Sequence, residues 1–283
     1  MQIQWYPGHM AKARRMLEEN LKLIDVVVEL VDARAPLATR NPDFDALFSQ
    51  KSRVILLNKS DLASAEQTKK WIEYYKAQNI NAIAFVSTSS AKRKAAVSLI
   101  EAAAADKVAK MKEKGVIKTV RAIVVGIPNV GKSTFINRIA GETKAKVGDK
   151  PGVTKGKQWV KVSPYLELMD TPGLLWPKLE NEALAKHLAY IGSINDDIMD
   201  AERLAADLLG ELIAICPNEL KERYKKTEEG MAPHELLEAV ARSRGFILQG
   251  GVMDTERAAR IVLDEFRAGK VAKITLESPD KEY

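Results

Sequence analysis

Short apolar runs alternate with helical stretches over roughly the first 180 residues. The apolar runs are rich in β-branched residues and predict six strands, at 25–31, 53–57, 80–86, 119–125, 157–162 and 165–169. Helical spacing between them predicts helices near 9–23, 63–78, 90–114 and 131–140. Because such alternation builds a mostly parallel sheet covered on both faces, we expect an α/β fold. Only Ser163 and Pro164 separate the last two strands, so these are expected to form an antiparallel hairpin at the sheet edge.

After Trp176-Pro177 the strand-like runs stop, and Leu, Ala, Glu and Arg recur at helical spacing at 200–215, 232–244 and 254–268. This change predicts an α/β domain with an N-terminal segment over 1–178 and a small all-helical domain over 179–283. At about 150 residues per domain, a chain of 283 residues is expected to form roughly two domains.

Composition narrows the class of protein. With 46% hydrophobic and 29% charged residues, the chain is expected to fold rather than to stay disordered. No apolar run approaches the roughly 18 residues of a membrane span, and the first residues lack a signal-peptide core. Cys216 is the only cysteine, so no disulfide can form within the chain and a cytoplasmic location is expected.

The formal net charge of +6 makes a nucleic-acid partner worth considering, although solvated surface lysines would explain it equally well. Basic residues gather at 92–94, at 107–118, in a loop rich in lysine at 144–161, and in the helical region at Lys221, Arg223, Lys225 and Lys226.

The segment Gly126-Ile-Pro-Asn-Val-Gly-Lys-Ser133 follows an apolar strand and opens a helix, which is the context of a phosphate-binding P-loop. Its glycines let backbone N–H groups face the phosphates, and the helix N-terminus adds positive potential. Lys132 is expected to reach the β- and γ-phosphates and Ser133 to bind Mg²⁺. The predicted nucleotide contacts here are Asn129, Val130, Gly131, Lys132, Ser133 and Thr134.

A second element, Asp170-Thr-Pro-Gly173, stands at the end of the last predicted strand. Asp170 is expected to hold the Mg²⁺ shell and Gly173 to present its N–H to the γ-phosphate. Thr154 lies between the two elements and is the candidate for a second hydroxyl on Mg²⁺, although an ordinary loop threonine is about as good an interpretation.

Base selection is predicted from Asn58-Lys-Ser-Asp61, again at the end of an apolar strand. A carboxylate at Asp61 can accept hydrogen bonds from N1–H and N2–H₂ of guanine, a donor pair that adenine lacks. Lys59 can lie over the base. These residues, with Ser60, favour GTP over ATP, and Ser87 and Thr88 after the next strand would complete the guanine pocket.

These motifs occur in reverse of the usual order, because the guanine motif precedes the P-loop. The order is permissible, since ligands bind at the carboxyl ends of the strands whichever strand comes first. Together with Trp5-Tyr-Pro-Gly-His-Met10, Asp32-Ala-Arg34 and Pro36, it resembles the circularly permuted GTPases over nearly the whole chain. The resemblance implies a P-loop GTPase that hydrolyses GTP to GDP and phosphate, with a C-terminal helical domain that binds RNA.

The family's known role implies a switch in late assembly of the large ribosomal subunit. The implied partners are that subunit and its rRNA, and the subunit is expected to stimulate hydrolysis. No membrane association is expected, and away from the ribosome the protein is expected to be a monomer. GTP or GDP and Mg²⁺ would be the ligands, and K⁺ a further one, because related GTPases hold potassium with an Asn at the position of Asn129.

Hydrolysis needs a group that orients water, and the usual Gln after the Asp-x-x-Gly motif is replaced by Leu174. The resemblance assigns that role to His9, as the catalytic residue, while a structural or RNA-contacting His9 is the alternative. His187 and His234 lack a partner motif and are expected to be surface or packing residues.

Two other functions fit the sequence less well. An RNA-docking protein in which GTP is mainly a structural ligand remains open because Leu174 cannot position water. A P-loop kinase is disfavoured, since the guanine motif selects the base and no pocket for an acceptor substrate is evident.

Overall fold

The computed structural model of the chain describes residues 7–141, 158–173, 181–194 and 200–283, and of residues 7–13 and 158 the backbone alone. Its six strands form one sheet in the order β3-β2-β1-β4-β6-β5. The strands are β1 Val26–Asp32, β2 Ser52–Asn58, β3 Asn81–Ala84, β4 Val120–Val125, β5 Gln158–Ser163 and β6 Leu166–Asp170. All neighbours pair in parallel except β5 and β6, which pair antiparallel. The predicted α/β fold with an antiparallel edge hairpin is confirmed.

Each face of the sheet is covered by helices because alternate strand residues point to opposite sides. Val28, Leu30 and Val124 face α4 (Arg93–Ala102) and α6 (Lys132–Ala140). The residues between them in sequence face the other side, where α1 (Pro7–Asn20), α2 (Asp43–Leu47) and α3 (Ala65–Ala77) pack. The short 3₁₀ turn Leu21–Leu23 leads from α1 into β1.

One predicted helix is wrong in its extent. Instead of a single helix over 90–114, the chain forms α4 and then α5 (Ala105–Glu113), with a break at Ala103 and Ala104. Ala104 is buried and has backbone angles of φ −104° and ψ 3°, outside the helical range. Since alanine is the best helix former, the sequence carries no signal for a break at this point.

The C-terminal region is helical, as predicted, with five helices among the described residues. These are α7 Glu182–Tyr190, α8 Ala201–Ile215, α9 Pro217–Arg223, α10 Pro233–Arg244 and α11 Thr255–Arg267. Asp200 and Asp254 cap α8 and α11 through their side chains, and Gly245 ends α10 in the left-handed conformation. No helix in the described parts of the chain is long and apolar enough to cross a membrane.

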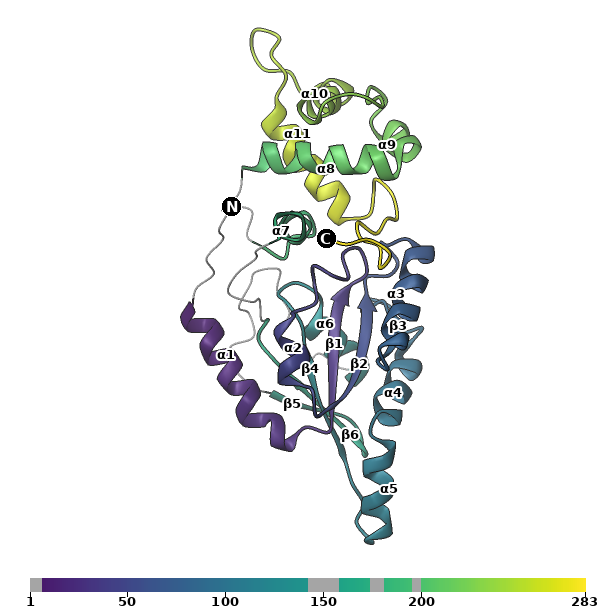
Figure 1. Ribbon diagram of the computed structural model, residues 1–283. Coiled ribbons are helices and arrows are strands. Elements are labelled where there is room, and N and C mark those ends of the chain that lie inside the picture. The colour runs from purple at the N-terminus through teal and green to yellow at the C-terminus, as the bar shows by residue number, and fades with distance from the viewer. Residues whose placement is uncertain (1–6, 142–157, 174–180, 195–199) are drawn as a thin grey trace.

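The helical region lies over the carboxyl ends of the central strands, with α7 nearest the sheet (Figure 1). Its apolar core of Leu208, Val240, Val262 and neighbours is continuous with the core under the α4 and α6 face of the sheet. The boundary near 178 between two domains therefore stays a prediction. The consequence for function is that any ligand at this edge of the sheet lies next to the helical region.

Candidate functional site

The P-loop occupies the turn between β4 and α6, where the sequence predicted it. Lys132 is the first residue of α6 and is buried, and its Nζ donates to the carbonyl oxygens of Gly126 at 3.1 Å and Ile127 at 2.8 Å. Burial lowers the pKa of Lys132 to about 8, against the opposing effect of Asp170. An incoming phosphate would favour the protonated form of this amine and replace the two carbonyl partners. Lys132 is thus placed to bind phosphate.

The predicted metal-binding groups lie together beside the P-loop. Ser133 Oγ donates to Asp170 Oδ2 at 2.9 Å, and Thr171 Oγ1 fixes the end of β6 by donating to the carbonyl of Val124 at 2.7 Å. A hydroxyl and a carboxylate are oxygen ligands of the kind that Mg²⁺ takes together with nucleotide phosphates. Thr154 lies outside the described residues.

Gly173 has no space for a side chain. A Cβ at this position would lie 2.7 Å from the backbone nitrogen of Pro128 in the P-loop. The Asp-x-x-Gly segment is therefore packed directly against the phosphate-binding loop.

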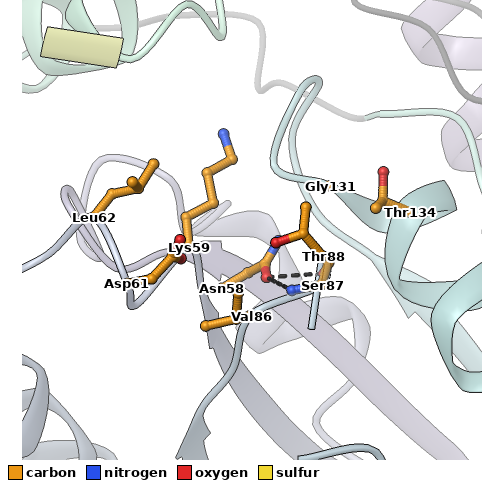
Figure 2. Close-up of a pocket in the computed structure, with 9 residues that line it drawn as sticks. All are labelled: Asn58, Lys59, Asp61, Leu62, Val86, Ser87, Thr88, Gly131 and Thr134. Carbon is orange, nitrogen blue, oxygen red and sulfur yellow. Dashed lines mark hydrogen bonds between the residues drawn. The ribbon is translucent and has the colours of Figure 1, made fainter. Parts of the chain in front are cut away.

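The guanine motif lines a pocket across from the P-loop (Figure 2). The lining residues are Asn58, Lys59, Asp61, Leu62, Val86, Ser87, Thr88, Gly131 and Thr134. Seven of them are among the predicted nucleotide contacts, and they come from the ends of β2 and β3 and from the start of α6. Ser60 instead turns to the sheet, where its Oγ donates to the carbonyl of Phe85 at 2.9 Å.

Asn58 stabilises this pocket through hydrogen bonds of its side-chain amide. Its Nδ2 donates to the carbonyl of Val130 at 2.8 Å, while its Oδ1 accepts from Ser87 N at 3.0 Å and Ser87 Oγ at 2.8 Å. Gly131 passes so close that a Cβ there would lie 2.5 Å from Asn58 Nδ2. Asn58 therefore joins the P-loop to the guanine loop through buried hydrogen bonds.

A residue that the sequence did not indicate holds the same loop from outside. Arg138 on α6 donates to the carbonyl oxygens of Ser87 at 3.2 Å and Thr88 at 2.7 Å. Its partners are backbone atoms about fifty residues away in the chain, so no local pattern identifies it.

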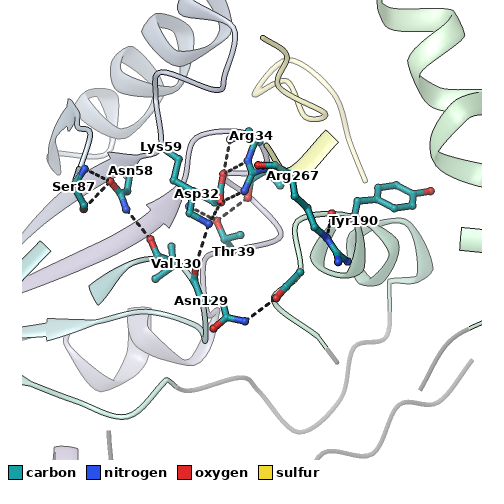
Figure 3. Close-up of polar contacts among 12 residues, drawn as sticks. Asp32, Arg34, Thr39, Asn58, Lys59, Ser87, Asn129, Val130, Tyr190 and Arg267 are labelled. Carbon is teal, nitrogen blue, oxygen red and sulfur yellow. Dashed lines mark hydrogen bonds and ion pairs between the residues drawn. The ribbon is translucent and has the colours of Figure 1, made fainter. Parts of the chain in front are cut away.

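Lys59 and Asn129 form a second connection between the guanine motif and the P-loop. Lys59 Nζ donates to the carbonyl of Asn129 at 2.9 Å and lies 3.0 Å from Asp32 Oδ2. Both Lys59 (φ 57°) and Asn129 (φ 59°) have left-handed backbones, a strained conformation that clusters at functional sites. Arg34 completes the group by binding Asp32 through Nε at 2.9 Å and Nη2 at 2.7 Å (Figure 3). The sequence drew attention to Asp32 and Arg34 through the resemblance alone and gave them no role.

The histidines lie in different surroundings. His9 falls in the first turns of α1, and its side chain is outside the described residues. His187 is buried between two carboxylates, 2.8 Å from Glu277 Oε1 and 3.1 Å from Glu211 Oε2. His234 is exposed on α10. Both His187 and His234 were expected to be surface or packing residues without partners; His234 is at the surface, whereas His187 is buried with two carboxylate partners.

Some of the predicted basic clusters are neutralised. Lys107 and Lys118 both pair with Asp25, and Arg223 pairs with Glu265. Lys221, Lys225 and Lys226 are exposed on the helical region. Most of the basic loop at 144–161 lies outside the described residues.

Comparison with known proteins agrees with this geometry. Residues 121–232 match the family model described as 50S ribosome-binding GTPase. Ribosome biogenesis GTPase A of Priestia megaterium is 46% identical over 283 residues, which cover 99% of this chain and 98% of that protein. The protein of the same name from Bacillus cereus is 44% identical, covering 99% of this chain and 95% of its own.

Solved structures give the same result. The GNP-bound structure of YlqF from Thermotoga maritima has a TM-score of 0.67 and 32% identity, covering 96% of this chain and all of that chain. The GDP-bound structure of TM YlqF has a TM-score of 0.68 and 30% identity, covering 94% of this chain and 99% of that one. The guanine motif, the P-loop and the reversed motif order thus occur on a matching fold, and the chain belongs to the ribosome biogenesis GTPase A family of circularly permuted GTPases.

Proposed function

We propose that this GTPase acts as a switch in late assembly of the large ribosomal subunit, binding the subunit through its rRNA and hydrolysing GTP there. The observation that carries the enzymatic part is the joining of the guanine pocket to the P-loop by Asn58 and Lys59. The names of the relatives and the description of the matched family support the ribosomal part.

The residues have separable roles in this reaction. Asp61 and Lys59 select the base, with Ser87 and Thr88 as the opposite wall of the pocket. Lys132 neutralises the triphosphate. Ser133 and Asp170, with Thr154, would hold Mg²⁺, which supplies positive charge to the β- and γ-phosphate oxygens. We assign to Asn129 the further role of binding K⁺, which predicts faster hydrolysis in K⁺ than in Na⁺.

Water activation is proposed to come from His9, because Leu174 replaces the usual Gln. An imidazole can orient water or accept its proton near neutral pH. The alternative function, an RNA-docking protein with GTP as a structural ligand, rests on the same leucine. It predicts GTP binding without multiple turnover on the subunit.

The decisive experiment is co-sedimentation with immature and mature large subunits, in GDP and in a non-hydrolysable GTP analogue, followed by turnover measurements. We expect binding to immature subunits that is stronger with the analogue, and multiple turnover when subunits are present. Nucleotide-independent binding without turnover would support the docking protein, and no binding would refute both ribosomal roles.

The His9→Ala variant tests water activation, with the exposed His234→Ala as the matched control. We expect subunit-stimulated turnover to fall at least tenfold in His9→Ala while GTP affinity stays within twofold. His234→Ala is expected to match the wild type. Equal turnover in all three proteins would remove His9 from the mechanism.

A further inference from the structure

The surroundings of Lys59 extend beyond the nucleotide pocket. Asp32 stands at the end of β1, fully buried, and binds the ammonium of Lys59 with Oδ2. Arg34 approaches the same carboxylate with three donors: its backbone N–H at 3.1 Å, Nε at 2.9 Å and Nη2 at 2.7 Å. Burial alone would raise the pKa of Asp32, but Arg34 and Lys59 outweigh burial and hold that pKa well below its usual range.

The fourth donor of Arg34 leaves the sheet region. Nη1 donates to the carbonyl of Arg267, the last residue of α11, at 3.1 Å, and the guanidinium lies 5.8 Å from the ring of Phe266. The carbonyl of Arg34 accepts from the backbone N–H of Leu276 at 2.7 Å. Arg34, 2% exposed, thus binds the partner of Lys59 and the helical region at the same time.

A second path returns from the helical region to the P-loop. The Arg267 side chain donates to the carbonyl oxygens of Ala189 at 2.8 Å and Tyr190 at 3.0 Å, at the C-terminal end of α7. Two residues further on, the carbonyl of Gly192 accepts from Asn129 Nδ2 at 2.8 Å. Since Lys59 Nζ binds the carbonyl of Asn129, the contacts form a closed ring through the guanine motif, the helical region and the P-loop (Figure 3).

We propose that Arg34 is a positioning residue of the guanine site, which shares the Asp32 carboxylate with Lys59 and thereby couples nucleotide affinity to the docking of the helical region. Without Arg34, Asp32 would have Lys59 as its one cationic partner within the ring and would draw the ammonium away from Asn129 and the base. The coupling is reciprocal, because whatever strengthens docking through Arg34 must strengthen nucleotide binding equally. This inference rests on the guanine assignment of the pocket.

The test compares Arg34→Lys with Arg53→Lys in the full chain. Arg53 is the matched control, because its guanidinium also pairs with a buried carboxylate, Glu29, but at the start of β2, at the opposite end of that strand from Asn58 and the pocket. We expect the Kd for GDP, measured by calorimetry, to rise roughly tenfold in Arg34→Lys, within the usual range of coupling factors. Arg53→Lys is expected to stay within twofold of the wild type. Unchanged GDP affinity in Arg34→Lys, or an equal loss in both variants, would overturn the proposal.

Hydrogen exchange supplies a readout that a merely structural ion pair would not change. In the wild type, saturating GDP should slow amide exchange over 271–277, the segment bound to Arg34, and in Arg34→Lys at saturating GDP this slowing should be lost. Wild-type exchange that is unaffected by GDP would overturn the coupling even if the variant failed to fold. Because these measurements use GDP alone, a failure of the ribosomal role would leave them unaffected.

Discussion

Asp61 is the residue to which we assign selection of the base. Its carboxylate lines the pocket beside Lys59 and is exposed to an incoming base. Two charge-assisted hydrogen bonds to the N1–H and N2–H₂ groups of guanine would each contribute about 1.5–3 kcal/mol.

We therefore expect Asp61→Asn to weaken GDP binding by about 100-fold, since both bonds lose their charged acceptor. The variant should gain affinity for xanthosine diphosphate, whose second carbonyl can accept from the new amide. Calorimetry with the two nucleotides measures both effects. Asp106→Asn, an exposed change on α5, should alter neither, and an Asp61→Asn protein with wild-type GDP affinity would refute the assignment.

Asn58 affects the same pocket indirectly. Its three hydrogen bonds join Val130 to Ser87, and all are buried. Removing one side chain that serves several buried groups costs more than a typical exposed hydrogen bond, because the partners left behind are desolvated and unsatisfied.

Asn58→Ala should lower the free energy of unfolding by about 2–4 kcal/mol and weaken GDP binding as well. Denaturant titration with and without GDP measures the two losses. The exposed Asn218→Ala on α9 is the control and should change stability by less than about 0.5 kcal/mol. An Asn58→Ala protein with the wild-type free energy of unfolding would show that the hydrogen bonds of Asn58 are not needed for stability.

At the scale of elements, the sequence predicted the strands well because they are short segments rich in apolar and β-branched residues. The P-loop helix was equally clear, since glycine and lysine positions mark its start. The break between α4 and α5 was missed because it falls at Ala103 and Ala104, and alanine is the residue type that most favours helix. The short helices α2, α7 and α9 were also not predicted, because they contain too few turns to show the helical repeat of apolar residues.

The contacts of the site were harder to predict than its motifs. Lys59, Asp61 and Lys132 could be found from the sequence alone, because each stands at a fixed position in a short motif, the guanine motif or the P-loop. Arg138 and Arg267 bind carbonyl oxygens of distant segments, and a carbonyl looks the same in every residue of the sequence. Their roles therefore needed the three-dimensional structure.

His187 links three elements through charge. From α7 it binds Glu211 on α8 and Glu277 in the C-terminal segment, and Glu277 in turn accepts from the backbone N–H groups of Leu37 and Ala38. Burial alone would lower the pKa of His187, but the two carboxylates outweigh it and raise the pKa to about 9. The imidazolium thus holds the C-terminal segment against both α7 and the sheet region.

This raised pKa predicts a pH-dependent stability. The folded protein binds the proton more tightly than the unfolded chain, whose pKa is near 6.5, so the contribution is complete below about pH 6.5 and is lost as pH rises to about 9. The loss amounts to at most about 3 kcal/mol. Denaturant titrations between pH 6 and 9.5 should show it in the wild type, and His187→Gln should flatten the profile over this range. A wild-type stability that is constant with pH would contradict the charged state.

At the scale of the whole molecule, the segment after Asp170 leads from the phosphate site into the helical region. Gly173 lies against Pro128, so a phosphate that moves the P-loop must also displace the start of this connection. We expect GTP to change the angle between the sheet and helical regions, in the manner of other GTPase switches.

Gly173→Ala tests this link, because the added Cβ would meet Pro128 at less than 3 Å. GTP turnover should fall at least tenfold, and affinity for a GTP analogue should drop more than affinity for GDP, since the analogue loses the γ-phosphate contact in addition to any disturbance of the P-loop. Small-angle scattering should differ between the GDP and analogue states of the wild type but not of the variant. Superimposable wild-type profiles would exclude a change of angle.

The position of β1 in the sheet also has a consequence for synthesis on the ribosome. Val26 is paired on one side with Ser52, soon after it in the chain, and on the other with Ala122, much later. Short loops close at lower entropic cost, so β1, β2 and β3 can assemble as soon as they emerge, before β4 is translated. The half of the site that carries the guanine motif is therefore translated and can fold first. A bound nucleotide can stabilise the folding protein only after β4 and the P-loop have paired with β1.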